Sequence, residues 1–247
     1  MLNVKKAVIL AAGMGLRLQP ITHYLPKCLV EVNGRSLLTR AINALESQGF
    51  DEVIVVTGFK NEMIEAAIKK MDVSIRIKTV HNEIYDSTNN IYSLWLVNDV
   101  VNEPFLLMES DLILEDEIYG AFTQPDRIAL DNYDPLIHSG TTVTINNLGI
   151  VDRMFIKKDP EQNTPIFKTV NVYSFSIQTW NLLRDKIAEH IDACDVNIFY
   201  EVAINSLIKS GQIEMEMVDF SRVMWHEIDS ISDYERVVHA TTLEFSN

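Results

Sequence analysis

Short apolar runs alternate with segments of helical periodicity over the first hundred or so residues. The runs are of strand length and cover residues 4–12, 52–58, 74–80 and 104–111. The first run is nearly continuous, which is typical of a central parallel strand. Helical spacing is seen over residues 36–48, 61–71 and 89–100. This alternation predicts an α/β fold, doubly wound around a mainly parallel, Rossmann-like sheet.

The pattern changes after about residue 125, where short strand-like runs replace the alternation. They indicate an antiparallel extension and cover residues 127–131, 141–146, 149–158 and 167–176. Helices are expected at about 177–190, 197–210 and from about 231, with a strand at 212–220. Ser230 with Asp233, or Ser232 with Glu235, has capping-box spacing for the last helix. We see no linker or repeat, so we expect one domain over residues 1–247.

Composition restricts the classes of partner. A hydrophobic content of 47% supports a substantial core, and a net charge of −14 argues against a nucleic-acid-binding surface. The cysteines Cys28 and Cys194 are far apart and show no metal-binding spacing, which indicates a reduced compartment. We expect Cys28 to be buried and not to act as a nucleophile. No apolar run has the length of a membrane span or a signal peptide, so we expect a cytoplasmic protein without membrane insertion.

The stretch LAAGMGLRLQPITHYLPK, residues 10–27, carries the first candidate chemistry. A dinucleotide fingerprint would need glycine or alanine where Leu18 stands, and no Walker loop occurs. A plain turn would explain Gly13 and Gly15 but not the cations Arg17 and Lys27. A phosphate-binding loop explains all four, because glycine lets backbone amides approach phosphates while Arg17 and Lys27 neutralise their charge.

This stretch resembles the signature G-x-G-[ST]-R-x-x-P-x-T-x-x-x-P-K of the nucleotidyltransferases, which include sugar-nucleotide pyrophosphorylases and small cytidylyltransferases. Leu16 departs from it, since serine or threonine is usual there. Further segments resemble the bacterial phosphocholine and 2-aminoethylphosphonate cytidylyltransferases: Tyr85–Val97, Phe105–Ile113 and Trp225–Val237. The segment Phe167–Ser176 is similar to members fused to an aminotransferase-like domain.

Two carboxylates are candidates for a metal site. Asp111 ends a predicted strand, and Asp229 precedes a predicted helix. The resemblance implies that they hold Mg²⁺, for which carboxylates are suitable ligands. Glu109 and Glu227 are weaker candidates, as outer neighbours of the metal. The alternative is that each aspartate only caps a turn or helix.

Nucleotide contacts are expected where successive strands end. With Arg17 and Lys27, the candidates are Ala11, Ala12, Gly13, Gly15, Gly58, Asn82 and Asn89. Asn89 could instead be a helix N-cap, and Asn82 a turn residue.

The resemblance also implies an acceptor site in the second half of the chain. Lys168 is the candidate for a phosphate or phosphonate group, although a strand lysine is often merely exposed. A cationic amine would suit carboxylates and aromatic faces, which Tyr173, Tyr200, Glu201 and Trp225 could supply unless these aromatic residues belong to the core. Lys157 and Lys158 are expected to form a solvated pair.

The family resemblance therefore implies a nucleotide-binding half, about 1–125, and an acceptor-binding half, about 126–247. The expected reaction is Mg²⁺-dependent transfer of CMP from CTP to 2-aminoethylphosphonate or phosphocholine, with Lys27, Arg17, Asp111 and Asp229 as the catalytic set. Two alternatives remain open: a sugar-1-phosphate nucleotidyltransferase and a non-catalytic nucleotide-binding module. A homodimer, or the front part of a fusion protein, is also possible.

Overall fold

Parallel strands form the centre of the molecule, as expected from the continuous apolar runs. The computed structural model describes residues 3–156 and 166–244, so the pair Lys157 and Lys158 lies outside the described residues. The parallel strands lie in the order β6 (Phe105–Glu109), β1 (Lys6–Ala11), β4 (Glu52–Thr57) and β5 (Arg76–His81). Every residue of β1 and β4 is buried, because each strand has a neighbour on both sides and helices cover the sheet.

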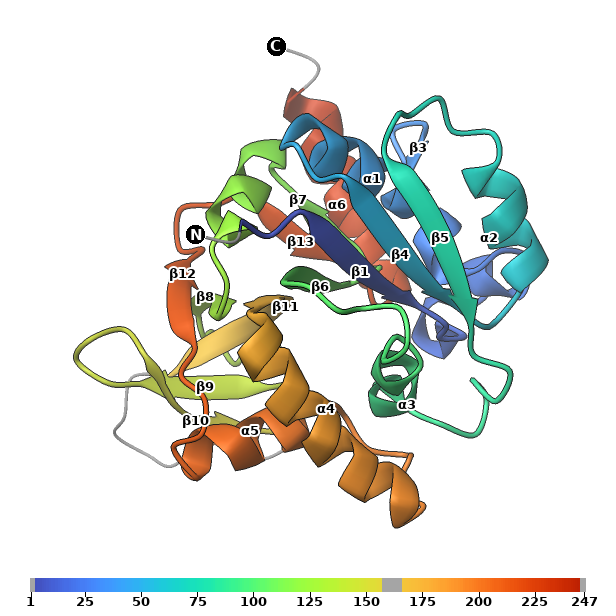
Figure 1. Ribbon diagram of the computed structural model, residues 1–247. Coiled ribbons are helices and arrows are strands. Elements are labelled where there is room, and N and C mark those ends of the chain that lie inside the picture. The colour runs from blue at the N-terminus through green and yellow to red at the C-terminus, as the bar shows by residue number, and fades with distance from the viewer. Residues whose placement is uncertain (1–2, 157–165, 245–247) are drawn as a thin grey trace.

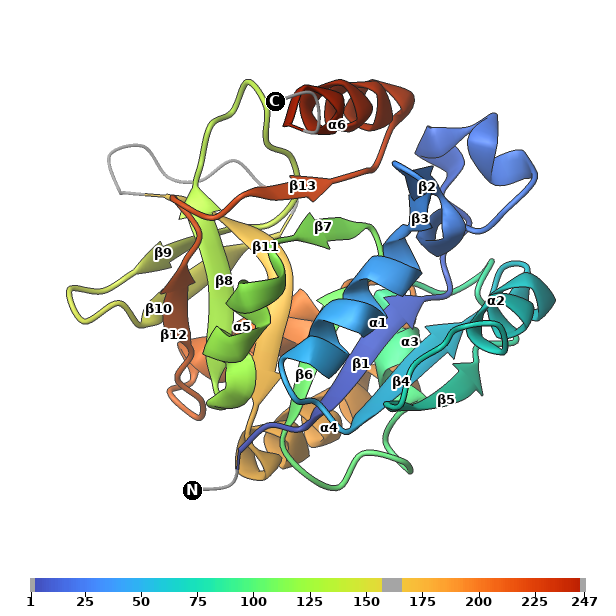
Figure 2. The ribbon, with the colours of Figure 1, turned by 90° about the horizontal axis from the view of Figure 1, so that it is seen from above.

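Alternate residues of β1 point into two different cores. Ala7 and Ile9 pack with the helix α1 (Leu37–Ser47), while Val8 and Leu10 pack with helices on the other face. That second group comprises α3 (Asn90–Trp95), α4 (Ile177–Asp192) and α5 (Glu201–Lys209). Figures 1 and 2 show α1 and α4 on opposite faces of the sheet. The doubly wound α/β fold predicted from the sequence is confirmed.

The helix ends follow from local sequence with one difference. Ser36 Oγ accepts a hydrogen bond from Thr39 N at 3.1 Å and so caps α1, and Gly49 at φ 76° ends the segment. The helix α2 (Asn61–Ile68) lies between β4 and β5 in the chain. The helix expected over 89–100 ends at Trp95, because tighter turns such as Val97 N to Leu94 O (3.3 Å) replace the α-helical bonds.

An antiparallel extension continues the same sheet. The strand β11 (Phe167–Phe175) pairs antiparallel with β6 and joins it to β8 (Arg127–Asn132) and β9 (Thr142–Ile145). The strand β10 (Val151–Phe155) forms an edge beside β9, and β12 (Glu216–Asp219) runs parallel to β8. The two halves of the chain therefore share one sheet of nine strands within the described residues.

Two small sheets were not predicted. One pairs β2 (Glu31–Val32) with β3 (Arg35–Ser36), and the other pairs β7 (Leu112–Leu114) with β13 (Trp225–Glu227). The remaining turns are short 3-10 helices at Leu16–Leu18, Ile21–His23, Lys27–Leu29 and Asp116–Thr123. Strands of two or three residues leave no period in a sequence, so pattern alone cannot find them.

The last helix, α6 (Ile231–Glu244), packs against a segment near the start of the chain. Ser230 and Asp233 form the capping box: Ser230 N donates to Asp233 Oδ2 at 2.9 Å, and Asp233 N donates to Ser230 Oγ at 3.3 Å. Val237 packs in a third core with Leu18 and Val30 from the glycine loop region. This core holds the segment before α6 against residues 16–32.

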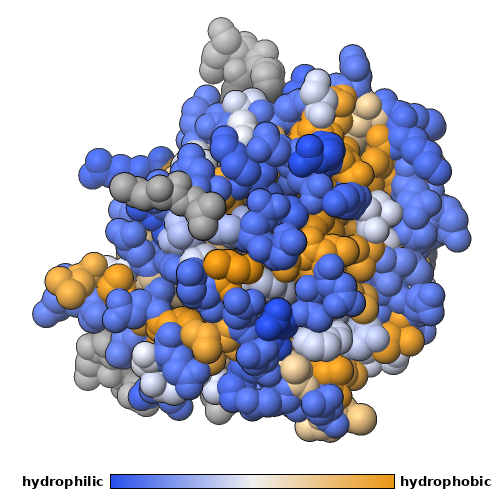
Figure 3. All heavy atoms as spheres, in the orientation of Figure 1, coloured by the Kyte–Doolittle hydropathy of each residue, from blue (hydrophilic) through white to orange (hydrophobic). Residues whose placement is uncertain are grey.

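The surface is mainly hydrophilic on the face shown in Figure 3, with an apolar group at the tip of the β9–β10 hairpin. Leu148 in that hairpin is 84% exposed. Among the described residues, no helix combines the length and the apolar character needed to cross a bilayer.

Candidate active site

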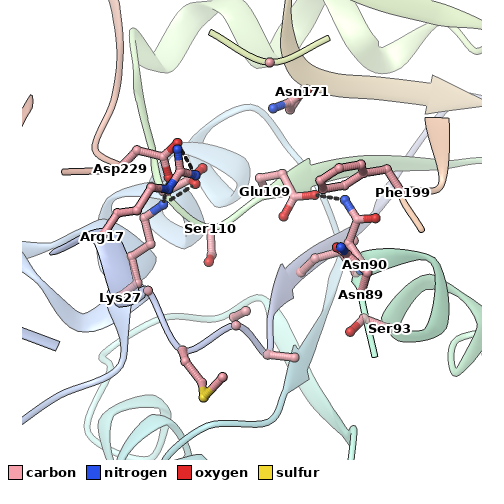
Figure 4. Close-up of a pocket in the computed structure, with 18 of the residues that line it drawn as sticks. Arg17, Lys27, Asn89, Asn90, Ser93, Glu109, Ser110, Asn171, Phe199 and Asp229 are labelled. Atoms are coloured by element: carbon pink, nitrogen blue, oxygen red, sulfur yellow. Dashed lines mark hydrogen bonds and ion pairs between the residues drawn. The ribbon is translucent and has the colours of Figure 1, made fainter. Parts of the chain in front are cut away.

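A cavity of about 790 Å³ opens at the carboxyl ends of the parallel strands. Its walls come from both halves of the chain: the glycine loop, residues 85–93, residues 109–111, residues 139–141, β11, and the ends of β13 and of the segment before α5. Figure 4 shows Arg17, Lys27 and Asp229 on one side, and Glu109, Asn90 and Phe199 on the other. This is the edge at which ligands bind in open α/β sheets.

The glycine loop is folded tightly behind one side of the cavity. Gly15 is left-handed at φ 61°, and a Cβ there would lie 3.0 Å from Thr22 Cγ2 and 3.2 Å from Lys27 Cβ. Thr22 Oγ1 donates to Gly15 O at 2.8 Å and fixes this approach. A Cβ on Gly13 would meet no atom within 4 Å, so the backbone there is open to a ligand. Ala11, Ala12 and Leu16 also line the cavity, Leu16 with 58% exposure.

Arg17 and Lys27 form ion pairs with the two predicted metal ligands, Asp111 and Asp229. Lys27 Nζ lies 2.6 Å from Asp111 Oδ2 and also contacts Asp229 Oδ1, while Arg17 Nη2 lies 2.7 Å from Asp229 Oδ2. Burial works against the charge of Lys27, but the two carboxylates outweigh it and raise its pKa above the ordinary value. Burial likewise opposes the charge of Asp229, yet Lys27 and Arg17 hold its pKa below the ordinary range. These four residues, which we call the paired cluster, are mutually charge-compensated.

The small sheet of β7 and β13 brings Asp111 and Asp229 together. Glu227 is paired with Leu112, and Ile228 N donates to Asp111 O at 3.0 Å. One carboxylate oxygen each from Asp111, Glu227 and Asp229 lies within 4.8 Å of the others. Asp111 Oδ1 is buried without a hydrogen-bond partner among the described residues. An oxygen-rich cluster with an unsatisfied carboxylate oxygen fits a hard cation such as Mg²⁺.

The opposite wall of the cavity contains two buried acids, Glu109 and Glu201, that form no ion pair with a cation among the described residues. Asn90 Nδ2 donates to Glu109 Oε1 at 3.2 Å, while Asn90 Oδ1 accepts from Tyr200 N at 3.0 Å. Burial, with the charges of Asp111 and Glu201, raises the pKa of Glu109 well above its ordinary value. Glu201 is 5% exposed, and burial raises its pKa to about 7. Its Oε2 has no hydrogen-bond partner in the described part of the chain.

Lys168 is an interior residue rather than an exposed strand lysine. It is 1% exposed, its Nζ donates to Thr169 O at 2.5 Å, and it lies 3.8 Å from Glu227 Oε2. A Cβ at Gly140 would lie 3.6 Å from this nitrogen, so the left-handed glycine leaves the ammonium uncovered on that side. Burial, only partly offset by Lys168, raises the pKa of Glu227 to about 7. A buried cation that lines the cavity is suited to an anionic group.

Some predicted nucleotide contacts do not reach the cavity. Asn82 is 1% exposed, and its amide is occupied by Thr88, Ser93 and the amide nitrogen of Ile84. It is therefore placed as the turn residue that the sequence left as an alternative. Gly58 lies behind the cavity wall, where a Cβ would lie 2.7 Å from Ala12 O. Asn89 does line the cavity, and its Oδ1 also accepts from Asn90 N at 2.8 Å and caps α3.

The three aromatic residues predicted on the acceptor side do not line the cavity either. Tyr173 and Tyr200 are fully buried and pack edge-to-face with centroids 5.7 Å apart, so they belong to the core behind Glu201. Trp225 lies outside the wall, where Nε1 donates to Asp131 Oδ2 at 2.7 Å and the ring stacks on His138 at 5.8 Å. The structure gives these rings packing roles.

The cavity wall contains residues that sequence reasoning missed. Phe199 lines the cavity from the segment before α5, and Asn171 lines it from β11. Ser139, Thr141 and Ser110 complete the polar lining. The segment FKTVN was already assigned to acceptor binding through Lys168, so Asn171 could have been added. Phe199 had no such signal, because a single aromatic residue before a helix is usually core.

The comparisons with known proteins agree with this geometry. Residues 7–121 match the model of the MobA-like NTP transferase domain. The choline-phosphate cytidylyltransferase of Streptococcus pneumoniae is 25% identical over 242 residues, which cover 94% of this chain and 96% of that protein. A 2-aminoethylphosphonate cytidylyltransferase of Lancefieldella rimae is 34% identical over 112 residues, 45% of this chain and 44% of that protein.

Solved structures show the same fold over nearly the whole chain. The CTP:phosphocholine cytidylyltransferase from Streptococcus pneumoniae has a TM-score of 0.79 at 22% identity, with 97% of this chain and 99% of that chain covered. A UDP-glucose pyrophosphorylase complexed with UDP-glucose has a TM-score of 0.81 at 16% identity, with 98% and 99% covered. Residues 7–121 thus match a nucleotidyltransferase domain, and the fold of the described chain is that of the nucleotidyltransferase structures. More narrowly, residues 7–121 form a MobA-like NTP transferase domain, and both cytidylyltransferases and sugar nucleotidyltransferases are among the relatives of the chain.

Proposed function

We propose that the protein transfers CMP from CTP to a small phosphorylated or phosphonylated amine, releases pyrophosphate and depends on Mg²⁺. The observation that carries this proposal is the division of one cavity into two chemically different sides. The paired cluster of Arg17, Lys27, Asp111 and Asp229 suits a triphosphate and its metal. Across from it, Glu109 and Glu201 suit a cationic amine.

The glycine loop and its cations would hold the triphosphate. Open backbone at Gly13 lets phosphate oxygens approach the amides, and Arg17 can clamp two oxygens at once. An anionic oxygen of the acceptor attacks the α-phosphorus and forms the new P–O bond. The bond from that phosphorus to the bridging oxygen of the β-phosphate breaks, and pyrophosphate leaves with the electron pair. The nucleophile is already anionic, so the reaction needs positioning and charge neutralisation rather than a general base.

Lys27 would neutralise charge at the reacting phosphorus. Its raised pKa keeps it an ammonium ion at any working pH, and it can exchange its carboxylate partners for phosphate oxygens. Asp111 and Asp229, with Glu227 beside them, would hold Mg²⁺, which when bound neutralises phosphate oxygens and helps to orient them.

The acceptor would lie between the two sides. Lys168 supplies a buried positive charge for its phosphate or phosphonate group. Glu109 and Glu201 would supply negative charge for the amine, and Phe199 adds an aromatic ring to the lining of the same cavity. Burial raises the pKa values of both acids, and the binding of an ammonium group would favour their ionised forms.

A matrix of substrates tests this proposal. Pyrophosphate release is measured with each of the four nucleoside triphosphates against 2-aminoethylphosphonate, phosphocholine and glucose 1-phosphate, with and without EDTA. We expect release only with CTP, an amine acceptor and Mg²⁺. Release with a hexose 1-phosphate would instead support sugar-nucleotide synthesis, which the similarity to a UDP-glucose pyrophosphorylase structure favours as the second candidate. Nucleotide binding without any release would support a non-catalytic module.

A further inference from the structure

One residue of β11 breaks the extended backbone at the edge of the cavity. Asn171 has φ 59°, a left-handed conformation, in the middle of a strand that runs from Phe167 to Phe175. The pairing of β11 with β8 shifts its register between Thr169 and Tyr173, so Asn171 lies within a bulge. Bulges redirect side chains, and a strained non-glycine residue persists only where its surroundings impose the conformation.

The bulge directs the Asn171 amide into the cavity. Figure 4 shows the side chain extending from β11 with its nitrogen at the far end, and Asn171 lines the same cavity as Lys168. The neighbouring residues Val170 and Val172 are buried in the core on the other side. The strand thus uses the bulge to present one polar group to the ligand space while its neighbours remain packed.

One end of the Asn171 amide contacts Thr169, which is fully buried. Thr169 Oγ1 lies 3.0 Å from Asn171 Oδ1 and 3.1 Å from Thr141 O, and its single proton can be donated to only one of them. With Oδ1 toward Thr169, Asn171 Nδ2 has no hydrogen-bond partner among the described residues. In this orientation the amide presents a neutral donor with two protons, and such a donor suits an oxyanion.

We infer that Asn171 is an acceptor-binding, specificity-determining residue whose Nδ2 donates to a phosphoryl or phosphonyl oxygen of the acceptor, next to Lys168. The inference deepens the proposed function and rests on it. The two residues have complementary roles, since Lys168 supplies charge and Asn171 supplies direction. A hydrogen bond depends on angle more strongly than an ion pair does. A directed contact would therefore fix which oxygen faces the nucleotide.

The backbone conformation allows a test that separates binding from structure. Glycine adopts the left-handed conformation without strain, so Asn171→Gly removes the amide and leaves the fold as stable as the parent or more stable. We expect the KM for the acceptor to rise by on the order of 10- to 100-fold, the loss of one hydrogen bond to a charged group, with the KM for CTP unchanged. Asn171→Asp retains the left-handed preference but places a negative charge against the oxyanion, so its acceptor KM should rise further.

A matched control is available in the turn between β2 and β3. Asn33 is also left-handed, at φ 51°, but it is exposed and does not line the cavity. Asn33→Gly should change the melting temperature in the same direction as Asn171→Gly and leave the acceptor KM unchanged. The inference is overturned if Asn171→Gly keeps the parental acceptor KM, or if Asn171→Asp binds the acceptor as well as the parent does.

Direct binding keeps this test independent of turnover. Calorimetric titration of methylphosphonate into the parent protein and into Asn171→Gly should show binding that weakens by the same 10- to 100-fold factor. Equal affinity in both proteins, or none in the parent, overturns the assignment of Asn171. Failure of CTP turnover with every acceptor overturns the proposed function, and the titration distinguishes the two outcomes.

Discussion

The two sides of the cavity handle buried charge in opposite ways. In the paired cluster, Arg17 and Lys27 compensate Asp111 and Asp229 through three short contacts. On the facing side, Glu201 is only 5% exposed and forms no ion pair among the described residues, although the charge of Lys168 acts to lower its pKa. Behind it, Tyr173 Oη and Tyr200 Oη have no hydrogen-bond partners in the same part of the chain. We call Glu201 and these two tyrosines the uncompensated cluster. The two aspartates on one side are paired with cations, whereas Glu201 on the other side has no ion-pair partner among the described residues.

This difference indicates how each side responds to a substrate. The paired cluster can exchange partners, because a triphosphate offers to Arg17 and Lys27 the negative charge that the aspartates now supply. A cation bound at the uncompensated cluster would add an ion pair to Glu201 without displacing an existing one. Under the proposed function, the first side would hold a charged, metal-bound substrate, and the second would provide selectivity for an amine.

Removing the cation that joins the paired cluster should have the largest effect. In Lys27→Ala, we expect kcat to fall by on the order of 10³, because charge at the reacting phosphorus loses its main neutralising group. Pyrophosphate release under saturating CTP measures this. Circular dichroism should show an unchanged fold, since Arg17 still pairs with Asp229. Near-parental turnover would contradict the role assigned to Lys27.

Ionisation of Glu201 in the uncompensated cluster should make acceptor binding depend on pH. With a pKa of about 7, Glu201 is mostly neutral at pH 6 and mostly ionised at pH 8. Because the ionised form attracts an ammonium group, the acceptor KM should fall roughly tenfold over this range. Steady-state kinetics of the parent and of Glu201→Gln compare the two forms. The variant keeps the titration of the acceptor and of the other cavity carboxyl groups, Glu109 and Glu227, so the difference between the two profiles reports Glu201, and equal pH profiles would contradict the assignment.

The same group should make stability depend on pH. A carboxyl whose pKa is raised in the folded protein binds more protons there than in the unfolded chain between its ordinary value of 4.5 and about 7. The free energy of unfolding therefore falls as the pH rises through this window, by up to about 3 kcal/mol. Glu201→Gln should flatten this fall and melt at a higher temperature than the parent at pH 8. If the melting temperatures of parent and variant change with pH in the same way, Glu201 does not carry the effect.

A smaller effect is expected where the backbone supports the glycine loop. A Cβ on Gly58 would lie 2.7 Å from Ala12 O and 2.7 Å from Tyr85 Cβ, so Gly58→Ala must displace the end of β1 or residue 85. We expect a loss of about 1–3 kcal/mol in stability, with a weaker effect on nucleotide affinity. Thermal melting with and without CTP measures both. Gly13→Ala is the matched control for stability, because its Cβ would meet no atom within 4 Å.

The smallest effect should come from the outer edge of the acceptor side. Trp225→Phe removes the hydrogen bond to Asp131, and neither of these two residues lines the cavity. We expect a loss of about 1 kcal/mol in stability and less than a twofold change in acceptor KM. A larger rise in KM would show that Trp225 contacts the acceptor, as the sequence had suggested.

The parallel strands and their helices were predictable because burial on both faces leaves continuous apolar runs, as in β1 and β4. The glycine loop, Asp111 and Asp229 were also predictable, since they lie in a specific motif or at strand ends. The sequence left Asn82 between two roles because an asparagine after a strand has the same signal whether it binds a ligand or closes a turn, and its buried hydrogen bonds favour the turn.

Features that depend on contacts between residues far apart in sequence could not be predicted. Nothing local marks Asn171 as left-handed, because the bulge arises from the pairing of β11 with strands far away in sequence. The raised pKa of Glu201 similarly depends on enclosure by residues from both halves of the chain. The sequence could name these residues or their segments as candidates, but only the assembled sheet decides which side chains face the cavity.

The pairing of β7 with β13 also determines when, during synthesis of the chain, Asp111 and Asp229 can come together. Asp111 and Asp229 become neighbours only when residues 225–228 have added to the strand that follows Asp111. A nascent chain that has completed all the parallel strands would already have the glycine loop with Lys27, yet only one of the two aspartates. Contacts this far apart in sequence form late. We therefore expect the reaction centre to mature after the nucleotide-binding half has folded, so that an incomplete chain could recognise a triphosphate before it could consume one.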